Sequence, residues 1–325
     1  MFVTGANSGI GFEISRALSR QGASVTMACR NPQKCFAAVD KIRNEEGYSG
    51  APLRPLIMDV SDLSSVQKAA GAYLMDRKKP LDMLFLNAGI FSTEHENDTT
   101  AKIPTSKDGI EKVFATNVVG HHLLYRLLEP TLQNSTMARV VVTSSVASIN
   151  WLPPYALPWR FGDTSPLIPA TLEELNAVVL PSLLRPYALY GRSKLAQVAW
   201  VKALTRRLGK ESTIYVNSAH PGVVQTNMIN AYESKMKGEM PSFLSSVLID
   251  MHLYLLNLIN WSAKEGALTE LYLGVATDEI QRNNVRGRYF HPQAVEVSHP
   301  YADNEELQES VWTLCEELVK SKIYW

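Results

Sequence analysis

Two side chains able to exchange a proton with a substrate stand one helical turn apart in the second half of the chain. Tyr190 and Lys194 occur in the sequence YGRSK, within a segment, 187–208, whose pattern predicts a helix. Residues four apart project from the same helix face, and a neighbouring cation favours the phenolate form of tyrosine. The pair therefore predicts a general acid–base group with a pKa below the usual value of about 10. A core tyrosine beside a solvated lysine is the alternative.

Polar residues from three other segments could complete such a site. The stretch 140–145 reads VVVTSS, an apolar strand that ends in hydroxyls, and Ser145 there could hydrogen-bond a substrate oxygen. Asn87-Ala88-Gly89 closes an earlier strand, where small residues leave space for a ligand ring. Asn117 lies inside a predicted helix although asparagine prefers caps and turns, so we expect it to face inward and hold a water. Ordinary turns would also explain Ser145 and the segment 87–89.

The first turn of the chain has the composition of a phosphate-binding loop. TGANSGIG follows a short apolar strand and opens a predicted helix, and three of its residues are glycine. Such a turn brings backbone amides at the positive end of a helix close to a pyrophosphate. A glycine-rich turn with no ligand is the alternative. The residues that we expect to contact a dinucleotide here are Thr4, Gly5, Asn7, Ser8, Gly9, Ile10 and Gly11.

The end of the second predicted strand indicates which dinucleotide is bound. NAD sites commonly place an acid there to hold the ribose hydroxyls, whereas an arginine accommodates the extra phosphate of NADP. This strand ends Ala28-Cys29-Arg30 and carries no carboxylate. A guanidinium can bind phosphate through two parallel hydrogen bonds, so we expect NADP(H) as cofactor with Arg30 as its phosphate ligand. A solvated surface arginine is the alternative.

Strand-length apolar runs alternate with helix-length amphipathic stretches along the chain. This order predicts an α/β fold, a Rossmann-type doubly wound parallel sheet with helices on both faces, in which ligands bind at the carboxyl ends of the strands. We expect one domain over residues 1–325. The predicted strands are 2–4, 24–29, 53–58, 83–86, 139–143, 214–218 and 288–290, and the predicted helices are 10–20, 31–46, 62–78, 107–132, 187–208, 263–276 and 304–320.

Charge and cysteine content restrict the class of partner. Lysine plus arginine and aspartate plus glutamate both number 32, so no net charge drives binding to nucleic acid. Three widely spaced cysteines without a C-x-x-C pair argue against a disulfide framework and against a metal site. The amino end has a glycine-rich turn where a signal peptide would need an apolar run. We therefore expect a cytoplasmic protein that acts on a small molecule.

These motifs, taken in order, resemble those of the short-chain dehydrogenase/reductase family from Phe2 to about Pro292. The family pattern T-G-x-x-x-G-x-G matches residues 4–11, and its N-A-G motif matches Asn87, Ala88 and Gly89. The acid after the third strand, which contacts adenine, matches Asp59 in the pair Asp59-Val60, and the P-G motif that reaches the nicotinamide matches Pro221, Gly222, Val223 and Thr226. The catalytic asparagine, serine, tyrosine and lysine match Asn117, Ser145, Tyr190 and Lys194.

The resemblance implies an oxidoreductase that transfers a hydride between NADP(H) and a carbonyl or alcohol. Tyr190 would be the acid–base group, Ser145 would orient the carbonyl, and Lys194 would hold the nicotinamide ribose and lower the tyrosine pKa. Asn117 would fix a water that links Lys194 to solvent. The phrases ACRNPQK, DGIEKVFATNVVGHHLLYRLL and SKLAQ are most similar to the retinol dehydrogenase branch, whose substrates are lipophilic. A homo-oligomer formed through the two long helices is also implied.

Two long segments depart from the family pattern. Tyr190 follows Ser145 by 45 positions, whereas the family needs a little over a dozen, and the extra stretch 151–186 contains several aromatic residues. We expect this insertion to cover the active site together with 224–262 and to form an apolar pocket; a surface decoration or a dimer contact is the alternative. Thr171-Leu172-Glu173-Glu174 predicts a capping box for a short helix.

Two further alternatives concern the whole protein. The segment 243–261 is rich in apolar residues but is interrupted by polar ones, so we expect a buried or substrate-covering helix, with peripheral contact with a membrane as the alternative. Some proteins of this fold bind the nucleotide without catalysis, so an NADP(H)-binding sensor or scaffold is the alternative to an enzyme.

Overall fold

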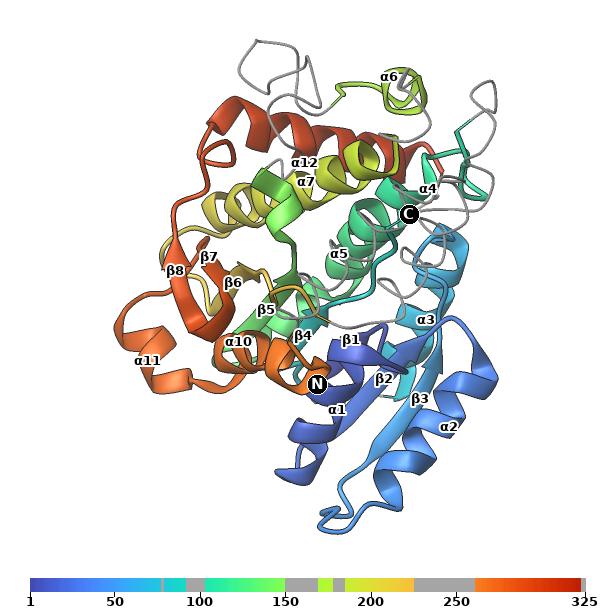
Figure 1. Ribbon diagram of the computed structural model, residues 1–325, viewed down its shortest axis with the longest axis vertical. Coiled ribbons are helices and arrows are strands. Elements are labelled where there is room, and N and C mark those ends of the chain that lie inside the picture. The colour runs from blue at the N-terminus through green and yellow to red at the C-terminus, as the bar shows by residue number, and fades with distance from the viewer. Residues whose placement is uncertain (77–78, 92–102, 150–168, 178–184, 225–260, 323–325) are drawn as a thin grey trace, which may run out of the picture.

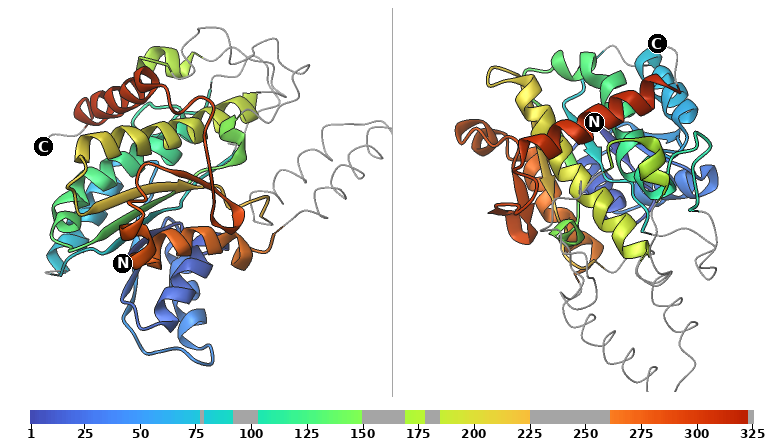
Figure 2. Two further views of the ribbon diagram at one scale, coloured as in Figure 1. Left: turned by 90° about the vertical axis from the view of Figure 1, so that its left-hand side faces the viewer. Right: turned by 90° about the horizontal axis from the view of Figure 1, so that it is seen from above.

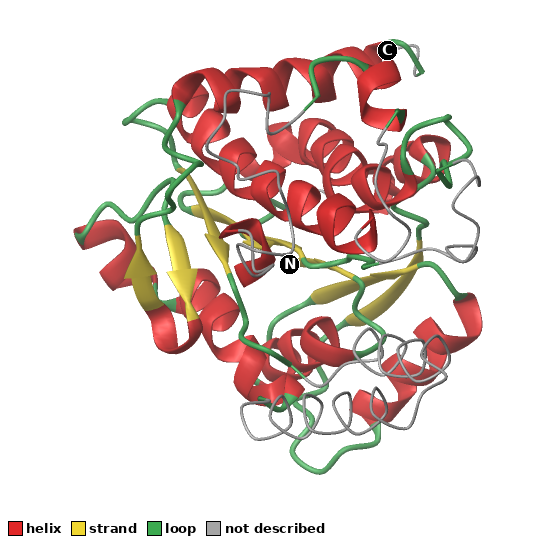
Figure 3. Cartoon of the chain, turned by 45° about the horizontal axis from the view of Figure 1, so that its top comes forward, coloured by secondary structure: helices red, strands yellow, loops and turns green. Residues whose placement is uncertain are grey.

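The protein is a single three-layer assembly of one sheet between two layers of helices. The computed structural model describes residues 1–76, 79–91, 103–149, 169–177, 185–224 and 261–322. Figure 2 shows the sheet edge-on, with the helices α5, α7 and α12 on one side and α1, α2 and α10 on the other. Figure 3 shows the same helix–sheet–helix layering from another direction. The fold is thus the predicted doubly wound α/β fold.

The sheet has eight strands in the order β3-β2-β1-β4-β5-β6-β7-β8. All neighbours are parallel except β7 and β8, which are antiparallel. The order reverses at β1, because β2 and β3 lie on one side of it and β4 on the other. The strands are β1 (Phe2–Thr4), β2 (Val25–Cys29), β3 (Leu53–Ile57), β4 (Met83–Leu86), β5 (Ala138–Thr143), β6 (Ile214–Ala219), β7 (Tyr289–His291) and β8 (Val295–Val297).

The helices begin where capping residues satisfy their first amides. Asn31 caps the helix that starts at Pro32, and Ser262 with Glu265 forms a complete capping box. The helices are α1 (Gly9–Arg20), α2 (Pro32–Arg43), α3 (Leu63–Asp76), α4 (Lys112–Phe114), η1 (Ala115–Val119), α5 (Gly120–Gln133), η2 (Val146–Ile149), α6 (Leu172–Asn176), α7 (Arg185–Leu208), α10 (Ala263–Val275), α11 (Thr277–Arg282), η3 (Pro292–Ala294) and α12 (Glu305–Lys320). Figure 1 labels most of them.

Two hydrophobic clusters fill the space on the two sides of the sheet. Val140 and Val142 of β5 point into the cluster under α5 and α7, whereas Val141 between them points into the cluster under α1 and α10. This alternation is the two-residue period of a strand with both faces covered. The uninterrupted run of valines is therefore the sequence signature of a central parallel strand.

The predicted helix 107–132 was only partly right. Residues 103–111 form a loop with a bridge from Thr105 to Glu111, and helical structure begins at Lys112. Between α4 and α5 the chain makes the π-helix η1. A single wide turn of this kind is rare inside a helix and occurs mostly at functional sites. The antiparallel strand β8 was not predicted either, because three residues, two of them exposed, give no clear alternation.

The long helix α7 does not present a free outer face. The C-terminal helix α12 lies along it (Figure 1), and Trp200 stacks on Trp312 with ring centroids 6.2 Å apart. His122 of α5 lies 3.1 Å from Glu316 of α12, so α12 contacts α5 as well as α7. A homo-oligomer formed through α5 and α7 stays a prediction, and the part of α7 under α12 is not available to it.

Most of the predicted insertion and covering segment lies outside the described residues. In the described part of the insertion, the hydroxyl of Thr171 accepts a hydrogen bond from the amide of Glu174 at 3.2 Å, which confirms the predicted cap of α6. The glutamate side chain returns to the amide of Ala170 rather than to that of Thr171. The segment 243–260 is not described. Within the described ranges, no helix has both the length and the apolar character needed to cross a bilayer.

Among the described glycines, Gly120 leaves the least room for a side chain, and this leads to a stability prediction. A Cβ on Gly120 would lie 1.9 Å from the carbonyl oxygen of Val60, whereas a Cβ on exposed Gly71 of α3 would meet nothing within 4 Å. We expect Gly120→Ala to lower the free energy of unfolding by about 3 kcal/mol because the backbones must separate. Gly71→Ala, the matched control, should raise it by about 0.5–1 kcal/mol. Equilibrium urea unfolding measures both, and equal midpoints for the two variants would contradict this packing.

Candidate active site

The glycine-rich turn after β1 forms one wall of the site at the point where the strand order reverses. Gly5 and Gly9 have φ values of 66° and 56°, which favour glycine. A Cβ on Gly11 would lie 2.5 Å from both the Asn87 side chain and the Gly5 carbonyl oxygen. The turn can therefore bend this sharply and pack this closely on β4 only with glycine at these positions.

The first turn of α1 is open to an anion. Its N-cap residue, Ser8, makes no side-chain capping bond, and no acidic residue lies in the first turn. By contrast, Asn31, Ser262 and Asn304 each cap their own helices through the side chain. Uncapped amides at the positive end of a helix are the donors that a phosphate group requires. The turn thus fits the pyrophosphate of a dinucleotide.

Thr4 supports this wall from inside rather than facing a ligand. It is completely buried, and its hydroxyl oxygen accepts hydrogen bonds from the amides of Asn87 and Ala88, both at 2.9 Å. The Asn87 side chain donates to the Thr4 carbonyl at 3.0 Å. The prediction that Thr4 contacts the cofactor is therefore wrong for its side chain. Thr4 instead fixes the end of β4 against the end of β1.

His121 connects Thr4 to Asn117, and it was not among the predicted site residues. Its Nε2 lies 3.0 Å from the Thr4 hydroxyl and its Nδ1 lies 3.2 Å from the carbonyl oxygen of Asn117. A carbonyl only accepts, so Nδ1 carries the hydrogen and Nε2 accepts from Thr4. Burial lowers the His121 pKa to about 3, and the ring stays neutral. The only sequence signal was its spacing, four residues after Asn117 on the same helix.

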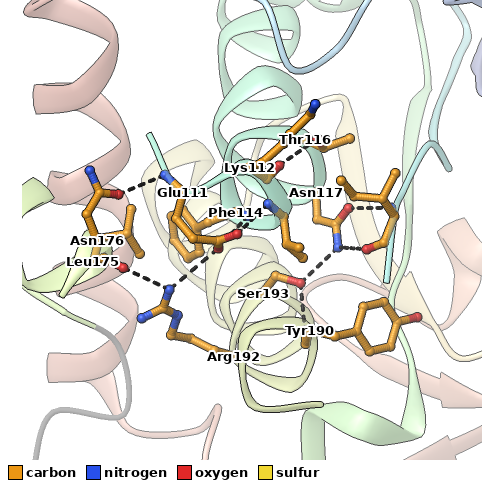
Figure 4. Close-up of polar contacts among 12 residues, drawn as sticks. Glu111, Lys112, Phe114, Thr116, Asn117, Leu175, Asn176, Tyr190, Arg192 and Ser193 are labelled. Carbon is orange, nitrogen blue, oxygen red and sulfur yellow. Dashed lines mark hydrogen bonds and ion pairs between the residues drawn. The ribbon is translucent and has the colours of Figure 1, made fainter. Parts of the chain in front are cut away.

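Asn117 occupies the π-helix η1 and joins two segments of the site. Its side-chain nitrogen Nδ2 donates to the Ile90 carbonyl at 3.0 Å and to the Ser193 hydroxyl at 2.9 Å. Its side-chain oxygen accepts from the main-chain amide of Ile90 at 2.9 Å (Figure 4). The wide turn of η1 accounts for an asparagine that looked misplaced inside a helix.

The water-holding role expected of Asn117 stays a prediction, and the main-chain carbonyl of this residue already has two partners among the described residues. In addition to the side-chain bonds, its main-chain carbonyl accepts from Gln197 at 2.8 Å and faces His121. Two partners fill the two lone pairs of a carbonyl oxygen. Asn117 therefore acts in this structure as a clamp between the N-A-G turn and α7.

Ser145 and Tyr190 come together despite the 45 positions between them. A Cβ on Gly191 would lie 2.9 Å from the carbonyl oxygen of Ala147, so glycine next to the tyrosine lets η2 approach α7. The side chain of Ser145 interacts with the phenol of Tyr190. The predicted convergence of a hydroxyl and a phenol at the carboxyl end of β5 is thus present.

The pKa of Tyr190 moves in the direction opposite to the one expected. Burial raises it to about 12, and the interaction with Ser145 offsets only part of that rise. The Nζ of Lys194 lies 5.4 Å from the centre of the tyrosine ring, but it donates to the carbonyl oxygen of Thr143 at 2.9 Å. The side chains of this chain therefore do not by themselves produce the lowered tyrosine pKa that the sequence indicated.

Lys194 is buried, and its pKa lies close to neutral pH. Burial lowers its pKa to about 7, and the carboxylate of Glu270 opposes that shift. The Ser144 hydroxyl donates to the main-chain carbonyl of Lys194 at 2.9 Å, which holds α7 against the end of β5. The side-chain nitrogen of Lys194 is thus hydrogen-bonded to Thr143, the last residue of β5, which Ser144 and Ser145 follow.

Glu270 is a buried carboxylate that sequence reasoning did not identify. It lies on α10 and is completely buried, and its carboxyl group interacts with the side chains of Thr143 and Lys194. Burial raises its pKa to about 8, and Lys194 offsets part of that rise. Its helix pattern gave no warning, because polar and apolar residues are not segregated to opposite faces of α10: Leu268 is exposed whereas Glu270 is buried.

Three side chains fix the backbone at Ser145. The Tyr289 hydroxyl donates to the Ser145 carbonyl at 3.1 Å, and the Ser148 hydroxyl donates to it at 2.6 Å. His299 accepts amide hydrogen bonds at Nδ1, so its Nε2 donates to the Ser148 hydroxyl at 3.1 Å. These contacts orient the turn that carries the Ser145 hydroxyl.

A buried ion pair positions the segment before η1. Glu111 caps α4 by accepting from the amides of Val113 and Phe114 at 2.6 and 2.9 Å (Figure 4). Arg192 of α7 lies 3.5 Å from the same carboxylate and donates to the Leu175 carbonyl at 3.1 Å. Burial raises the Glu111 pKa and lowers that of Arg192. The pair holds α4, α6 and α7 together behind Tyr190.

The remaining predicted cofactor residues occupy the carboxyl edge with different exposures. Arg30 is exposed after β2. One oxygen of Asp59 accepts from the amide and hydroxyl of Ser61, and Val60 is buried. Gly222 has a φ of 91° and is held by a bond from its amide to His220 at 3.1 Å. The glycine-rich turn and the start of α1 carry Asn7, Ser8 and Ile10. The turn after β4 carries Gly89, and the turn after β6 carries Pro221 and Val223. Thr226 lies outside the described residues.

Comparison with known proteins supports the same assignment. The family model described as short chain dehydrogenase matches residues 1–156. Human retinol dehydrogenase 13 is 31% identical over 322 residues, which cover 98% of this chain and 84% of that protein. The WW domain-containing oxidoreductase of Gallus gallus is 31% identical over 326 residues, covering 99% of this chain and 68% of that protein.

Solved structures show the same fold at lower identity. The NADPH-bound carbonyl reductase from chicken fatty liver matches with a TM-score of 0.56 at 20% identity, over 91% of this chain and 97% of that chain. L-sorbose reductase from Gluconobacter frateurii matches with a TM-score of 0.63 at 16% identity, over 90% and 94%. Since the retinol dehydrogenases are about 30% identical over nearly the whole chain, the chain belongs to the short-chain dehydrogenase/reductase family, resembles its retinol dehydrogenase branch, and is an oxidoreductase that uses a nicotinamide cofactor.

Proposed function

We propose that the protein transfers a hydride between NADP(H) and the carbonyl or alcohol carbon of a lipophilic small molecule. One observation carries the proposal: Tyr190, Ser145 and Lys194 converge at the carboxyl end of β5, at the same edge of the sheet as the uncapped end of α1. An acid–base group, a hydroxyl and a cation beside a phosphate-binding turn are the parts that carbonyl reduction requires.

Each side chain has a defined part in the reaction. When bound, the nicotinamide ring of the cofactor supplies or accepts the hydride. Ser145, fixed through its backbone, hydrogen-bonds the substrate oxygen, and Tyr190 gives that oxygen its proton or removes it in the reverse direction. A phenol with a raised pKa is protonated at pH 7, as the proton donor in a reduction must be. Lys194 holds the cofactor ribose through its ammonium.

The choice of NADP(H) depends on Arg30. It is exposed directly after β2, next to the turn that bears the free amides of α1, and Lys34 follows in the first turn of α2. Two cations and no carboxylate between residues 29 and 35 make this corner suitable for an additional phosphate.

A lipophilic substrate is supported by the groups next to the phenol. The ring of Phe91 lies 5.1 Å from that of Tyr190, centroid to centroid, and Ile90 precedes it on the turn that Asn117 holds. Apolar rings beside the reacting hydroxyl favour a hydrocarbon chain or ring over a polar substrate. The relatives named retinol dehydrogenase are consistent with this substrate class.

The first test removes the proton that the reaction needs. Tyr190→Phe should lower kcat/KM for NADPH-dependent reduction of a hydrophobic aldehyde by about 10²–10⁴-fold, because general acid catalysis contributes that much. Tyr48→Phe, which also removes one hydroxyl but lies in the loop after α2, is the matched control and should retain full activity. Equal turnover by wild type and Tyr190→Phe would contradict the role of Tyr190 as the acid–base group, and absence of turnover by the wild type would leave the sensor or scaffold alternative.

The second test concerns the cofactor phosphate. Arg30→Asp should weaken NADPH binding about 10- to 100-fold, since it removes a charge-assisted bond and adds a like charge. Binding of NADH should change little. Arg282→Asp introduces the same charge change on exposed α11 and should alter neither constant. Titration of each protein with both nucleotides measures the ratio, and an unchanged NADPH-to-NADH ratio in Arg30→Asp would contradict this cofactor assignment.

The third test is independent of substrate and examines the buried charge beside Lys194. Glu270 holds its proton in the folded protein up to about pH 8, whereas an unfolded glutamate loses it near pH 4.3. The native state thus binds more protons between these values, and stability falls as the pH rises through that window. Glu270→Gln should remove this fall. Urea unfolding at pH 5 and pH 7.5 should show that the free energy of unfolding of the variant rises relative to that of the wild type at the higher pH.

The control for this measurement is Glu211→Gln, which alters an exposed glutamate. Its stability difference from wild type should be the same at both pH values. A pH-independent gap for Glu270→Gln would mean that Glu270 is ionised in the folded protein.

A further inference from the structure

Cys29 and Cys35 lie with their sulfur atoms in contact beneath the corner proposed for the cofactor phosphate. Cys29 is the last residue of β2 and Cys35 lies in the first turns of α2. Their Sγ atoms are 2.6 Å apart, and both residues are buried, with 2% and 0% of their surface exposed. A disulfide bond is about 2.05 Å long, so the two thiols need to move only slightly to be joined. This contact was not predicted, because a spacing of six residues matches none of the cysteine motifs considered.

The two thiols have different surroundings. Cys35 lies near the positive end of α2, a position that favours thiolate, and its pKa is lowered by the hydrogen bond with Cys29. The same contact, together with burial, raises the pKa of Cys29. Both thiols also face the carbonyl oxygen of Met27, at 3.3 Å from Cys35 and 3.7 Å from Cys29. Cys35 is therefore the nucleophile of the pair and Cys29 the group that resolves its oxidised form.

We propose that Cys29 and Cys35 are a modification site that a peroxide converts reversibly to an intramolecular disulfide, and that the disulfide weakens NADP(H) binding. The second half rests on the proposed function. In the reaction the Cys35 sulfur attacks one peroxide oxygen, the O–O bond breaks, and Cys35 becomes a sulfenic acid while one water leaves. The Cys29 sulfur then displaces the second water as the S–S bond forms. The two thiols lose two protons and two electrons, and these reduce one hydrogen peroxide to two waters.

The coupling to the cofactor site follows from what surrounds Cys29. Arg30 is the next residue, and the backbone amide of Ala6, in the glycine-rich turn, interacts with the Cys29 sulfur. The amide of Gly5 donates to the carbonyl of Ala28 at 2.9 Å. A disulfide would enclose Arg30 and the cap of α2 in a short covalent ring and would remove the thiol hydrogens. The modification thus acts on the phosphate ligand and on the glycine-rich turn together.

The pair can be reached by opening one peripheral helix. α2 packs on β2 and β3, and β3 is the edge strand of the sheet. Figure 1 shows α2 at this corner, away from the layer formed by α5, α7 and α12. Helices at an edge open locally at lower free energy than the core does. A small oxidant can enter by that route without global unfolding.

Cys315 provides a control within the same chain. It lies on α12, is completely buried, and its pKa is raised by burial. Among the described residues it has no cysteine close to it. Peroxide treatment that forms the disulfide should therefore leave Cys315 reduced.

The experiment treats the reduced full-length protein with hydrogen peroxide and measures its intact mass and its trypsin fragments without reductant. Wild type and Cys315→Ser should each lose about 2 Da, the mass of two hydrogens. The peptides 21–30 and 35–41, which trypsin would otherwise release separately, should appear joined through sulfur. Dithiothreitol should restore the original mass. Cys35→Ser should show none of these changes.

The same samples are titrated with NADPH. The oxidised wild type should bind about tenfold more weakly than the reduced protein, which corresponds to loss of one charge-assisted contact, and Cys35→Ser should bind equally before and after peroxide. By linkage, NADPH should make the disulfide easier to reduce by the same factor. Peptides that stay separate in the peroxide-treated wild type would overturn the modification site, and a joined pair with unchanged NADPH affinity would overturn its coupling to the cofactor. Failure of the reduced protein to bind NADPH would refute the proposed function alone, because the mass measurement needs no nucleotide.

Discussion

The structure depends on the requirement that polar groups buried at the centre of the fold be hydrogen-bonded. Thr4, His121 and Asn117 form one continuous chain of such bonds, and it joins the end of β1 to the turn after β4 and to α7. An unpaired buried donor or acceptor costs about 1–3 kcal/mol, so these segments have one favourable arrangement. That arrangement places the glycine-rich turn and the helix of Tyr190 at the same edge of the sheet.

The fold followed from the sequence because its signals are local. The valines of β5, the Asn31 cap and the Pro32 start of α2 each determine structure within a few residues. The π-helix η1 did not follow, since its wide turn is set by bonds from Asn117 to a distant loop and to α7. The antiparallel strand β8 was missed for a similar reason, because its register depends on β7 rather than on its own pattern.

The candidate site was predictable in its residues but not in its charges. Spacing identified Tyr190 and Lys194, yet burial shifts the pKa of both, with Ser145 acting on Tyr190 and Glu270, from the opposite face of the sheet, acting on Lys194. The cysteine pair shows the same limit, since contact between Cys29 and Cys35 depends on the packing of α2 against β2. Type and spacing indicate which groups can react, and packing decides their protonation and their partners.

The proposed chemistry requires Tyr190 and Ser145 to hold one substrate oxygen together. The decisive experiment is a crystal structure of the protein with NADP⁺ and the alcohol product of an active lipophilic aldehyde. We expect the product oxygen within about 3.2 Å of both the Tyr190 hydroxyl and the Ser145 hydroxyl. A product bound elsewhere, or a Tyr190 hydroxyl turned away from that oxygen, would contradict it.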